Sequence, residues 1–142
     1  MILRLKEREI SAIRYFYELL CPLSHANTPI VVAPPHDPEI KESGIHDLAK
    51  MMCKNGLWID ATDCLVRTTK IPKLSVGGSR AIFVHLNTIK VVNPEIINRK
   101  AVFILDDVTT TGNTLTACKM LITKAGALAV KGYALGETYL QR

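Results

Sequence analysis

Three helices are predicted from apolar residues that recur every three or four positions, which is the spacing of one helix face. The first covers residues 7–20 and ends before Pro22, because proline cannot continue a helix. The second ends at Asn55 and Gly56, and the third follows Gly112 and ends at Gly126. Their apolar positions are, in order, Ile10, Ile13, Tyr17 and Leu20; Ile45, Leu48 and Met52; and Leu115, Cys118, Ile122 and Ala125.

Short apolar runs between and beside these helices predict strands. The predicted strands cover residues 29–33, 57–66, 81–92, 101–105 and 127–135. The first and fourth runs are continuously apolar, as in buried strands, whereas the second alternates at Leu57, Ile59 and Ala61 and the third suggests a hairpin through Asn87. Strands that alternate with helices predict an α/β fold, a mostly parallel central sheet flanked by helices.

The segment from Val102 to Leu115 carries the clearest chemistry of the chain. An apolar strand delivers Asp106 and Asp107 at its carboxyl end, and a turn rich in Thr and Gly then leads into a helix. In open α/β sheets, ligands bind beyond the carboxyl ends of the strands. A helix start offers backbone N–H groups and a positive dipole end to a phosphate. The candidate phosphate-binding residues are Thr109, Thr110, Thr111, Gly112, Asn113 and Thr114.

The two carboxylates need a different partner, because they would repel a phosphate. Sugar hydroxyls or a hydrated Mg²⁺ are the natural partners of Asp106 and Asp107. Carboxylates beside a phosphate-binding turn therefore indicate a site for a ribose phosphate.

Three other interpretations of this segment were weighed. Receiver domains of response regulators also carry an Asp-Asp pair, but theirs precedes the phosphoacceptor strand, and only 35 residues (142 − 107) follow Asp107. A Walker A loop ends in Gly-Lys-Thr or Gly-Lys-Ser, and Gly112-Asn113-Thr114 lacks the lysine. A threonine-capped helix after a buried strand explains either half of the segment, but not the ordered combination.

The run from Val102 to Thr114 resembles the motif with which type I phosphoribosyltransferases bind 5-phosphoribosyl 1-diphosphate (PRPP). That motif has four apolar residues, Asp-Asp, an apolar residue, any residue, Thr-Thr-Gly, any residue and Thr, and every position matches here. The resemblance, which covers residues 29–139, implies that Asp106 and Asp107 contact the ribose hydroxyls, directly or through Mg²⁺ and water. It also implies that residues 109–114 hold the 5′-phosphate.

The same resemblance implies where the diphosphate binds. Pro34, Pro35 and His36 follow the first strand, where the family places its diphosphate loop, and the prolines would permit a cis peptide bond. Residues 67–80 take the place of the flexible loop that closes over the active site. The candidate cations of this loop are Arg67, Lys70, Lys73 and Arg80, of which one or two are expected to act and the others to be solvated.

The order of Arg67, a basic loop, Arg80 and the Asp-Asp strand is similar to that in the ComF-type branch of the family, but the amino-terminal zinc ribbon of that branch is missing. We expect a single domain over residues 1–142. Residues 1–28 would form an N-terminal helix and a small hood over the acceptor, with residues 29–142 as the PRPP-binding core. The tail, residues 136–142 with Tyr139, would complete the hood.

Composition and charge alter this picture little. The chain is 48% hydrophobic and 22% charged, which is ordinary for a soluble domain, and no apolar run approaches the roughly 18 residues of a membrane span. The first 20 residues mix charges with apolar residues, unlike a secretory signal, so we expect a cytoplasmic protein. The net charge of +5 suits a phosphate-rich ligand and equally suits nucleic acid. The four cysteines form no CxxC pair and are expected to be reduced thiols.

Together these patterns predict a Mg²⁺-dependent phosphoribosyltransferase with PRPP and a nucleobase-like acceptor as partners. We expect it to work as a homodimer, without a membrane. Two other functions stay open, a regulator that senses PRPP without turnover and a ComF-like accessory to nucleic-acid processing. Single-strand binding is less favoured, because the chain has only eight aromatic residues (1 Trp, 4 Tyr and 3 Phe) and no stacking cluster.

Overall fold

The computed structural model describes residues 1–23, 27–54, 56, 58–72, 79–109 and 111–137, without the side chains of residues 79, 80, 108, 109 and 137. The helices are α1 (Ile2–Lys6), α2 (Ile10–Leu20), α3 (Gly44–Lys54), α4 (Ser79–Thr88) and α5 (Asn113–Lys124), with short 3-10 turns at Cys21–Leu23 and Pro94–Ile96. The strands are β1 (Thr28–Val32), β2 (Trp58–Asp60), β3 (Leu65–Arg67), β4 (Ile89–Val91), β5 (Ala101–Thr109) and β6 (Ala129–Glu137).

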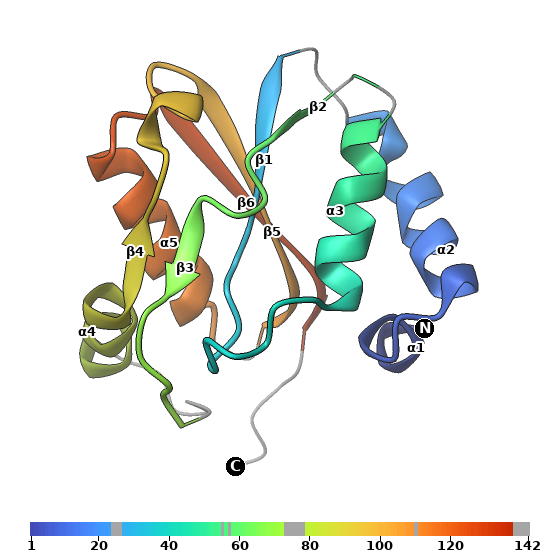
Figure 1. Ribbon diagram of the computed structural model, residues 1–142, viewed down its shortest axis with the longest axis horizontal. Helices are drawn as coiled ribbons and strands as arrows, with labels where there is room; N and C mark the ends of the chain where they lie inside the picture. The colour runs from blue at the N-terminus through green and yellow to red at the C-terminus, as the bar shows by residue number, and fades with distance from the viewer. Residues whose placement is uncertain (24–26, 55, 57, 73–78, 110, 138–142) are drawn as a thin grey trace.

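A parallel four-stranded sheet in the order β2-β1-β5-β6 forms the centre of the molecule, and β3 and β4 pair separately as an antiparallel unit. Helices α1, α2 and α3 lie on one side of the sheet, and α4 and α5 lie on the other with the β3–β4 pair (Figure 1). The predicted α/β class, with a mostly parallel central sheet flanked by helices, is confirmed.

The central strands are buried on both faces, which is why their sequences are continuously apolar. Ile30 and Val32 of β1 pack with the side chains of α2 and α3, and Val31 packs with those of α5. On β5, Phe103 stacks on Tyr133 with ring centroids 6.1 Å apart, while Ile104 faces the opposite cluster. Side chains therefore alternate between two cores, one on each side of the sheet.

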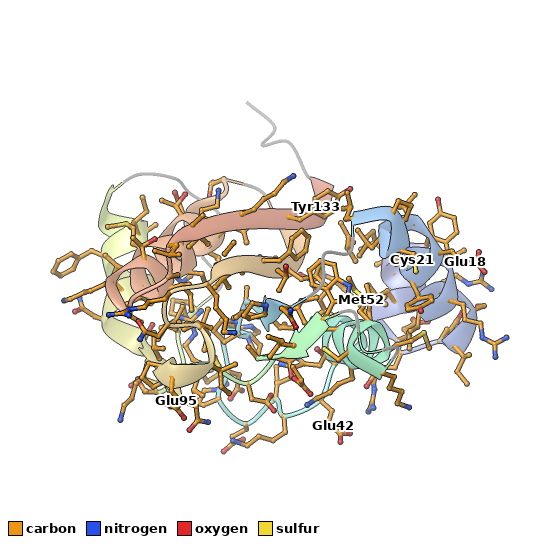
Figure 2. All side chains as sticks on the ribbon, turned by 90° about the horizontal axis from the view of Figure 1, so that it is seen from above. Glu18, Cys21, Glu42, Met52, Glu95 and Tyr133 are labelled. Atoms are coloured by element: carbon orange, nitrogen blue, oxygen red, sulfur yellow. The ribbon has the colours of Figure 1, made fainter. Side chains whose placement is uncertain are left out.

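Figure 2 shows the two cores from above, with Met52 of α3 directed toward the sheet and Glu95 at the outside of the molecule. No helix among the described residues is long and apolar enough to cross a bilayer. Across the same residues every peptide bond is trans, including those before Pro34 and Pro35, so the cis bond that these prolines would permit is not formed.

The predicted strand over residues 57–66 is wrong, because a turn divides it. The backbone N–H and the hydroxyl of Thr62 both donate to Asp60 Oδ1, at 3.1 and 2.7 Å. This local bonding ends β2 at Asp60 and sends β3 into the second sheet. Of the described residues in the predicted alternation, Ile59 is half-buried and Ala61 lies after β2 has ended.

The predicted strand and hairpin over residues 81–92 are also wrong, since residues 79–88 form α4 and only Ile89–Val91 is a strand. Ala81 and His85 stand one helical turn apart and are buried, whereas Phe83 is 64% exposed. The apolar content of this run had suggested a strand, but part of it faces outward.

The first predicted helix begins later than expected, because the chain turns at Arg8 (φ 61°) between α1 and α2. Ile10, predicted on the buried face, is 67% exposed, while Phe16, which lay outside the predicted face, is 4% exposed. The buried face of α2 is therefore rotated from the predicted one, although Ile13 and Leu20 belong to both.

A close contact between α3 and α1 should make Gly44 intolerant of any side chain. A Cβ at Gly44 would overlap the carbonyl oxygen of Leu5, a fully buried residue. We expect Gly44→Ala to lower the free energy of unfolding by about 1–3 kcal/mol, the usual cost of overpacking. Urea denaturation measures it. Lys54→Ala, at an exposed position of the same helix, should stay within about 0.5 kcal/mol of wild type, and an equally mild effect at Gly44 would contradict the packing.

Candidate functional site

A cavity of about 490 Å³ lies at the carboxyl ends of β1 and β5. Parallel strands end at the same edge of a sheet, so the loops that follow them gather there. Seven of the residues that the sequence proposed for ligand binding line this cavity: Pro34, Pro35, His36, Arg67, Asp106, Asp107 and Thr114. They come from segments up to 80 residues apart (114 − 34), and the fold brings them to one space.

The carboxyl-terminal part of strand β5 places the two carboxylates at the cavity. The strand alternation turns Asp106 and Asp107 to opposite faces, and the N–H of Asp107 donates to Asp106 Oδ1 at 2.8 Å. Burial, and next the negative charge of Asp107, raise the pKa of Asp106 to about 7. The pair therefore tends to hold a proton, which a sugar hydroxyl or a cation could replace.

The turn after β5 leads into α5 through a glycine. Gly112 adopts a left-handed conformation (φ 78°), which glycine adopts without steric cost. The hydroxyl of Thr111 accepts from the N–H of Asn113 at 3.3 Å, and Thr114 faces the cavity one residue further. The Asn113 Nδ2 atom is buried and has no hydrogen-bond partner among the described residues. Thr110 and the side chain of Thr109 lie outside the described residues.

Arg67 is the buried cation of the site, only 3% exposed. Its Nε donates to the Pro35 carbonyl at 2.9 Å, and Nη1 donates to Thr88 Oγ1 at 2.7 Å. Both Nη1 and Nη2 also lie 3.3 Å from Nδ1 of His85. Burial lowers the pKa of Arg67, and no carboxylate among the described residues pairs with it. A guanidinium without a counter-ion at a cavity wall favours a bound anion.

The other three candidate cations stand differently. Lys70 Nζ lies 3.5 Å from Asp37 Oδ2, with a side chain that is 70% exposed, and Lys70 does not line the cavity. Lys73 lies outside the described residues, and Arg80 is placed at the start of α4 without a described side chain. Arg67 is thus the candidate that the described structure brings to the site.

Sequence reasoning missed five further residues that line the cavity: Lys6, Ser43, Ile45 and His46 on the side of α1 and α3, and His85 on α4. His46 Nδ1 lies 2.9 Å from Ser43 Oγ, and burial lowers the pKa of this histidine. Lys6 belongs to α1, and it is the only described residue of the expected hood segment 1–28 that lines the cavity. The rest of the described segment builds the core, since Ile13, Phe16 and Leu20 of α2 are buried there. No local motif marks these residues; their positions depend on helix packing.

The thiols lie elsewhere. Cys64 and Cys118 are buried, Cys21 and Cys53 are half-buried, and all four are free. The described residues hold no group of three or more His, Cys, Asp or Glu side chains suited to a metal. Asp106 and Asp107 nevertheless offer hard oxygen donors, and burial, followed by the negative charge of Asp107, raises the pKa of Asp106. This donor set fits Mg²⁺ whose remaining ligands come from a substrate and water.

Comparison with known proteins adds little. No protein-family model matches the chain, and no curated protein sequence is similar to it. Among solved structures, the hypoxanthine phosphoribosyl transferase of Trypanosoma cruzi is similar, with a TM-score of 0.49 and 11% sequence identity, over 98% of this chain and 74% of that one. A likeness this distant assigns no function, so the chemistry of the cavity must carry the functional inference.

The raised pKa of Asp106 predicts a pH-dependent cost of folding. Between the usual Asp pKa of about 3.9 and the folded value of about 7, the folded chain holds the extra proton, so stability falls as pH rises through this window. We expect the free energy of unfolding of Asp106→Asn, relative to that of wild type, to rise by about 1–2 kcal/mol from pH 4 to pH 8. This figure is reduced for partial exposure. Urea titrations without Mg²⁺ or phosphate measure it. Glu95→Gln should give no such trend, and a flat difference for Asp106→Asn would refute the assignment.

Proposed function

We propose that this protein is a Mg²⁺-dependent phosphoribosyltransferase, which moves the phosphoribosyl group of PRPP to a nitrogen of a nucleobase-like acceptor and releases diphosphate. One observation carries the proposal. A single cavity is lined by an Asp-Asp pair, a threonine at a helix start and a buried arginine that pairs with no carboxylate of the described residues. These groups match the three parts of PRPP, which are a diol, a monoester phosphate and a diphosphate.

The 5′-phosphate would bind at the start of α5. The first N–H groups of a helix have no partner within the helix, and the dipole places partial positive charge there. Thr114 adds a hydroxyl that lines the cavity, and Gly112 has no Cβ to block a phosphate oxygen. Thr109, Thr110 and Thr111 complete the proposed set of phosphate-binding residues. A dianionic monoester phosphate suits this site better than a larger polyphosphate, because the carboxylates stand close by and repel further negative charge.

The ribose would lie over Asp106 and Asp107, whose oxygens accept hydrogen bonds from the 2′- and 3′-hydroxyls. The same two carboxylates would hold Mg²⁺, directly or through water. When bound, Mg²⁺ supplies positive charge that stabilises the departing diphosphate. The protein's own part is to fix the sugar between the α5 turn and the residues that follow β1.

The diphosphate would lie against Arg67 and the loop at Pro34, Pro35 and His36. Arg67 donates to the Pro35 carbonyl, and this hydrogen bond holds the guanidinium and the loop in fixed positions relative to each other. Its guanidinium has five N–H donors, and the bonds to Pro35, Thr88 and His85 occupy four of them. The fifth, on Nη2, has no partner among the described residues and can reach a ligand from the buried wall of the cavity.

The reaction exchanges one bond at the anomeric carbon for another. The acceptor nitrogen forms a bond to C1, the C1–O bond breaks, and diphosphate leaves with the electron pair while the nitrogen loses its proton. Positive charge builds on the sugar and negative charge on the leaving group, so Asp107 and Arg67 face charges of the sign that they stabilise. No Ser or Cys nucleophile is needed.

The acceptor would enter from the side of α1 and α3. Lys6, Ser43, Ile45 and His46 line that wall, which combines hydrogen-bonding groups with one apolar side chain. A flat nitrogenous base needs this combination, with edges bonded and a face covered.

The decisive experiment is PRPP-dependent diphosphate release, screened with Mg²⁺ across purine, pyrimidine and nicotinic bases. Release with one base class supports the enzyme. PRPP binding without release for any base replaces the enzyme with a PRPP sensor. Salt-sensitive binding of single-stranded nucleic acid without PRPP binding would point to the nucleic-acid accessory instead. No heat on titrating PRPP into the protein with saturating Mg²⁺ would overturn the proposal.

Asp107 should be indispensable for turnover. We expect Asp107→Asn to lower kcat by about 10²-fold or more, the usual loss for one preorganised electrostatic contact. Steady-state diphosphate release measures it. The matched control is Glu95→Gln. Glu95 is exposed and does not line the cavity, so the loss of its carboxylate should leave kcat unchanged. Wild-type turnover in Asp107→Asn would eliminate the mechanism.

Arg67 should hold the diphosphate where Lys70 does not. We expect Arg67→Met to weaken the binding of inorganic diphosphate by about 10–100-fold, the value of one hydrogen bond to a charged group. Lys70→Met, which removes a charge already paired with Asp37, should stay near wild type. Calorimetry measures both affinities. The reverse order would mean that Lys70 leaves Asp37 to meet the ligand.

A further inference from the structure

His85 occupies a position that no motif predicts. It lies on α4, is 5% exposed, and stands between Arg67 of β3 and Thr114 of α5. Its Nδ1 lies 3.3 Å from both terminal nitrogens of Arg67, and its Nε2 lies 3.3 Å from Oγ1 of Thr114. One ring therefore connects the cation of the proposed diphosphate site to the hydroxyl of the proposed phosphate site.

The chemistry of arginine determines which ring nitrogen carries the proton. A guanidinium can only donate, so Nδ1 of His85 must accept with its lone pair. A neutral imidazole with a bare Nδ1 has its proton on Nε2. Nε2 then donates to Thr114 Oγ1, the only described hydrogen-bond partner of that nitrogen.

The consequence falls on the hydroxyl of Thr114. The oxygen of this hydroxyl accepts a hydrogen bond from His85. The hydroxyl proton is therefore not donated to the imidazole ring and can be donated to another group. Thr114 lines the cavity, where that group would be a phosphate oxygen of a ligand. With the opposite tautomer, Thr114 would donate to the ring and present only lone pairs to an anion, which would repel it.

We infer that His85 is a positioning residue for the phosphate site: Arg67 fixes its tautomer, and His85 in turn aims the Thr114 hydroxyl proton at a bound phosphate monoester. The inference rests on the proposed function for the identity of the ligand, but not on turnover. It also means that the two phosphate-binding ends of the cavity are coupled through one side chain.

The surroundings of His85 agree with a neutral ring. Burial, and next the positive charge of Arg67, lower its pKa. The charge that acts on it is that of Arg67 on β3, which also interacts with the Cys118 thiol of α5, and the carboxylates of Asp106 and Asp107 line the same cavity from β5. An apolar side chain would be enough if His85 only filled space, but both ring nitrogens of His85 take part in hydrogen bonds.

The test measures by calorimetry how tightly ribose 5-phosphate binds to four variants of the protein and to one control variant. His85→Phe keeps a ring but neither bond, and should weaken binding by about 5-fold or more; Thr114→Val should lose about 10-fold or more. The double variant should bind ribose 5-phosphate as tightly as Thr114→Val alone, because both substitutions remove the same hydrogen bond from Thr114 to the phosphate. His85→Gln keeps a donor and an acceptor and should recover most of the affinity. Phe83→Leu, exposed on the same helix, is the control.

A second measurement needs no variant. Nitrogen-15 spectra of histidine-labelled wild-type protein distinguish a bare Nδ1 from a protonated one. We expect His85 to show a bare Nδ1 and a protonated Nε2 at pH 7. A proton on Nδ1, unchanged affinity in His85→Phe, or losses that multiply in the double variant would each overturn the inference.

These outcomes separate the inference from the proposed function. If wild type binds ribose 5-phosphate and releases diphosphate while His85→Phe matches it, only the inference fails. If binding depends on His85 but diphosphate is never released, the inference holds and the transferase fails. If wild type binds neither ribose 5-phosphate nor PRPP, both fail.

Discussion

The ligand-facing end of this structure depends on how one buried guanidinium is held. Arg67 belongs to β3, outside the main sheet, yet it donates to the loop after β1 and to two residues of α4. A charge with so little exposure is costly unless its donors are satisfied, so the loop after β1 and helix α4 are held where they can accept. The β3–β4 unit and α4 are thereby fixed beside the main sheet, and the cavity acquires its positive wall.

The carboxylates of β5 and the guanidinium of Arg67 lie at different parts of the cavity wall. The described residues contain no ion pair between them. Burial raises the pKa of Asp106 to about 7, and no carboxylate of the described residues pairs with Arg67. A ligand with hydroxyls in its middle and phosphates at its ends suits both groups, whereas a neutral apolar ligand suits neither.

Local patterns predicted the central sheet and α5 well, because strands buried on both faces must be apolar throughout and the Thr-Gly turn has a strong local preference. They failed at the periphery. Residues 81–92 have strand-like composition, but α4 packs against α5 and buries Ala81 and His85 one helical turn apart, and most of the run is helical. The Asp60–Thr62 turn divided a run that looked like one strand. At such half-buried positions tertiary contacts outweigh local propensity.

The sequence by itself determined the α/β class and the order of strand, Asp-Asp pair, threonine turn and helix, since these depend on neighbours along the chain. Tertiary structure decided which candidate cation faces the cavity, that Lys6 and His46 join it, and that His85 links Arg67 to Thr114. Burial and hydrogen-bond geometry between distant segments decide these points. A lysine or histidine has the same chemistry in every sequence, and only the folded environment determines what it meets.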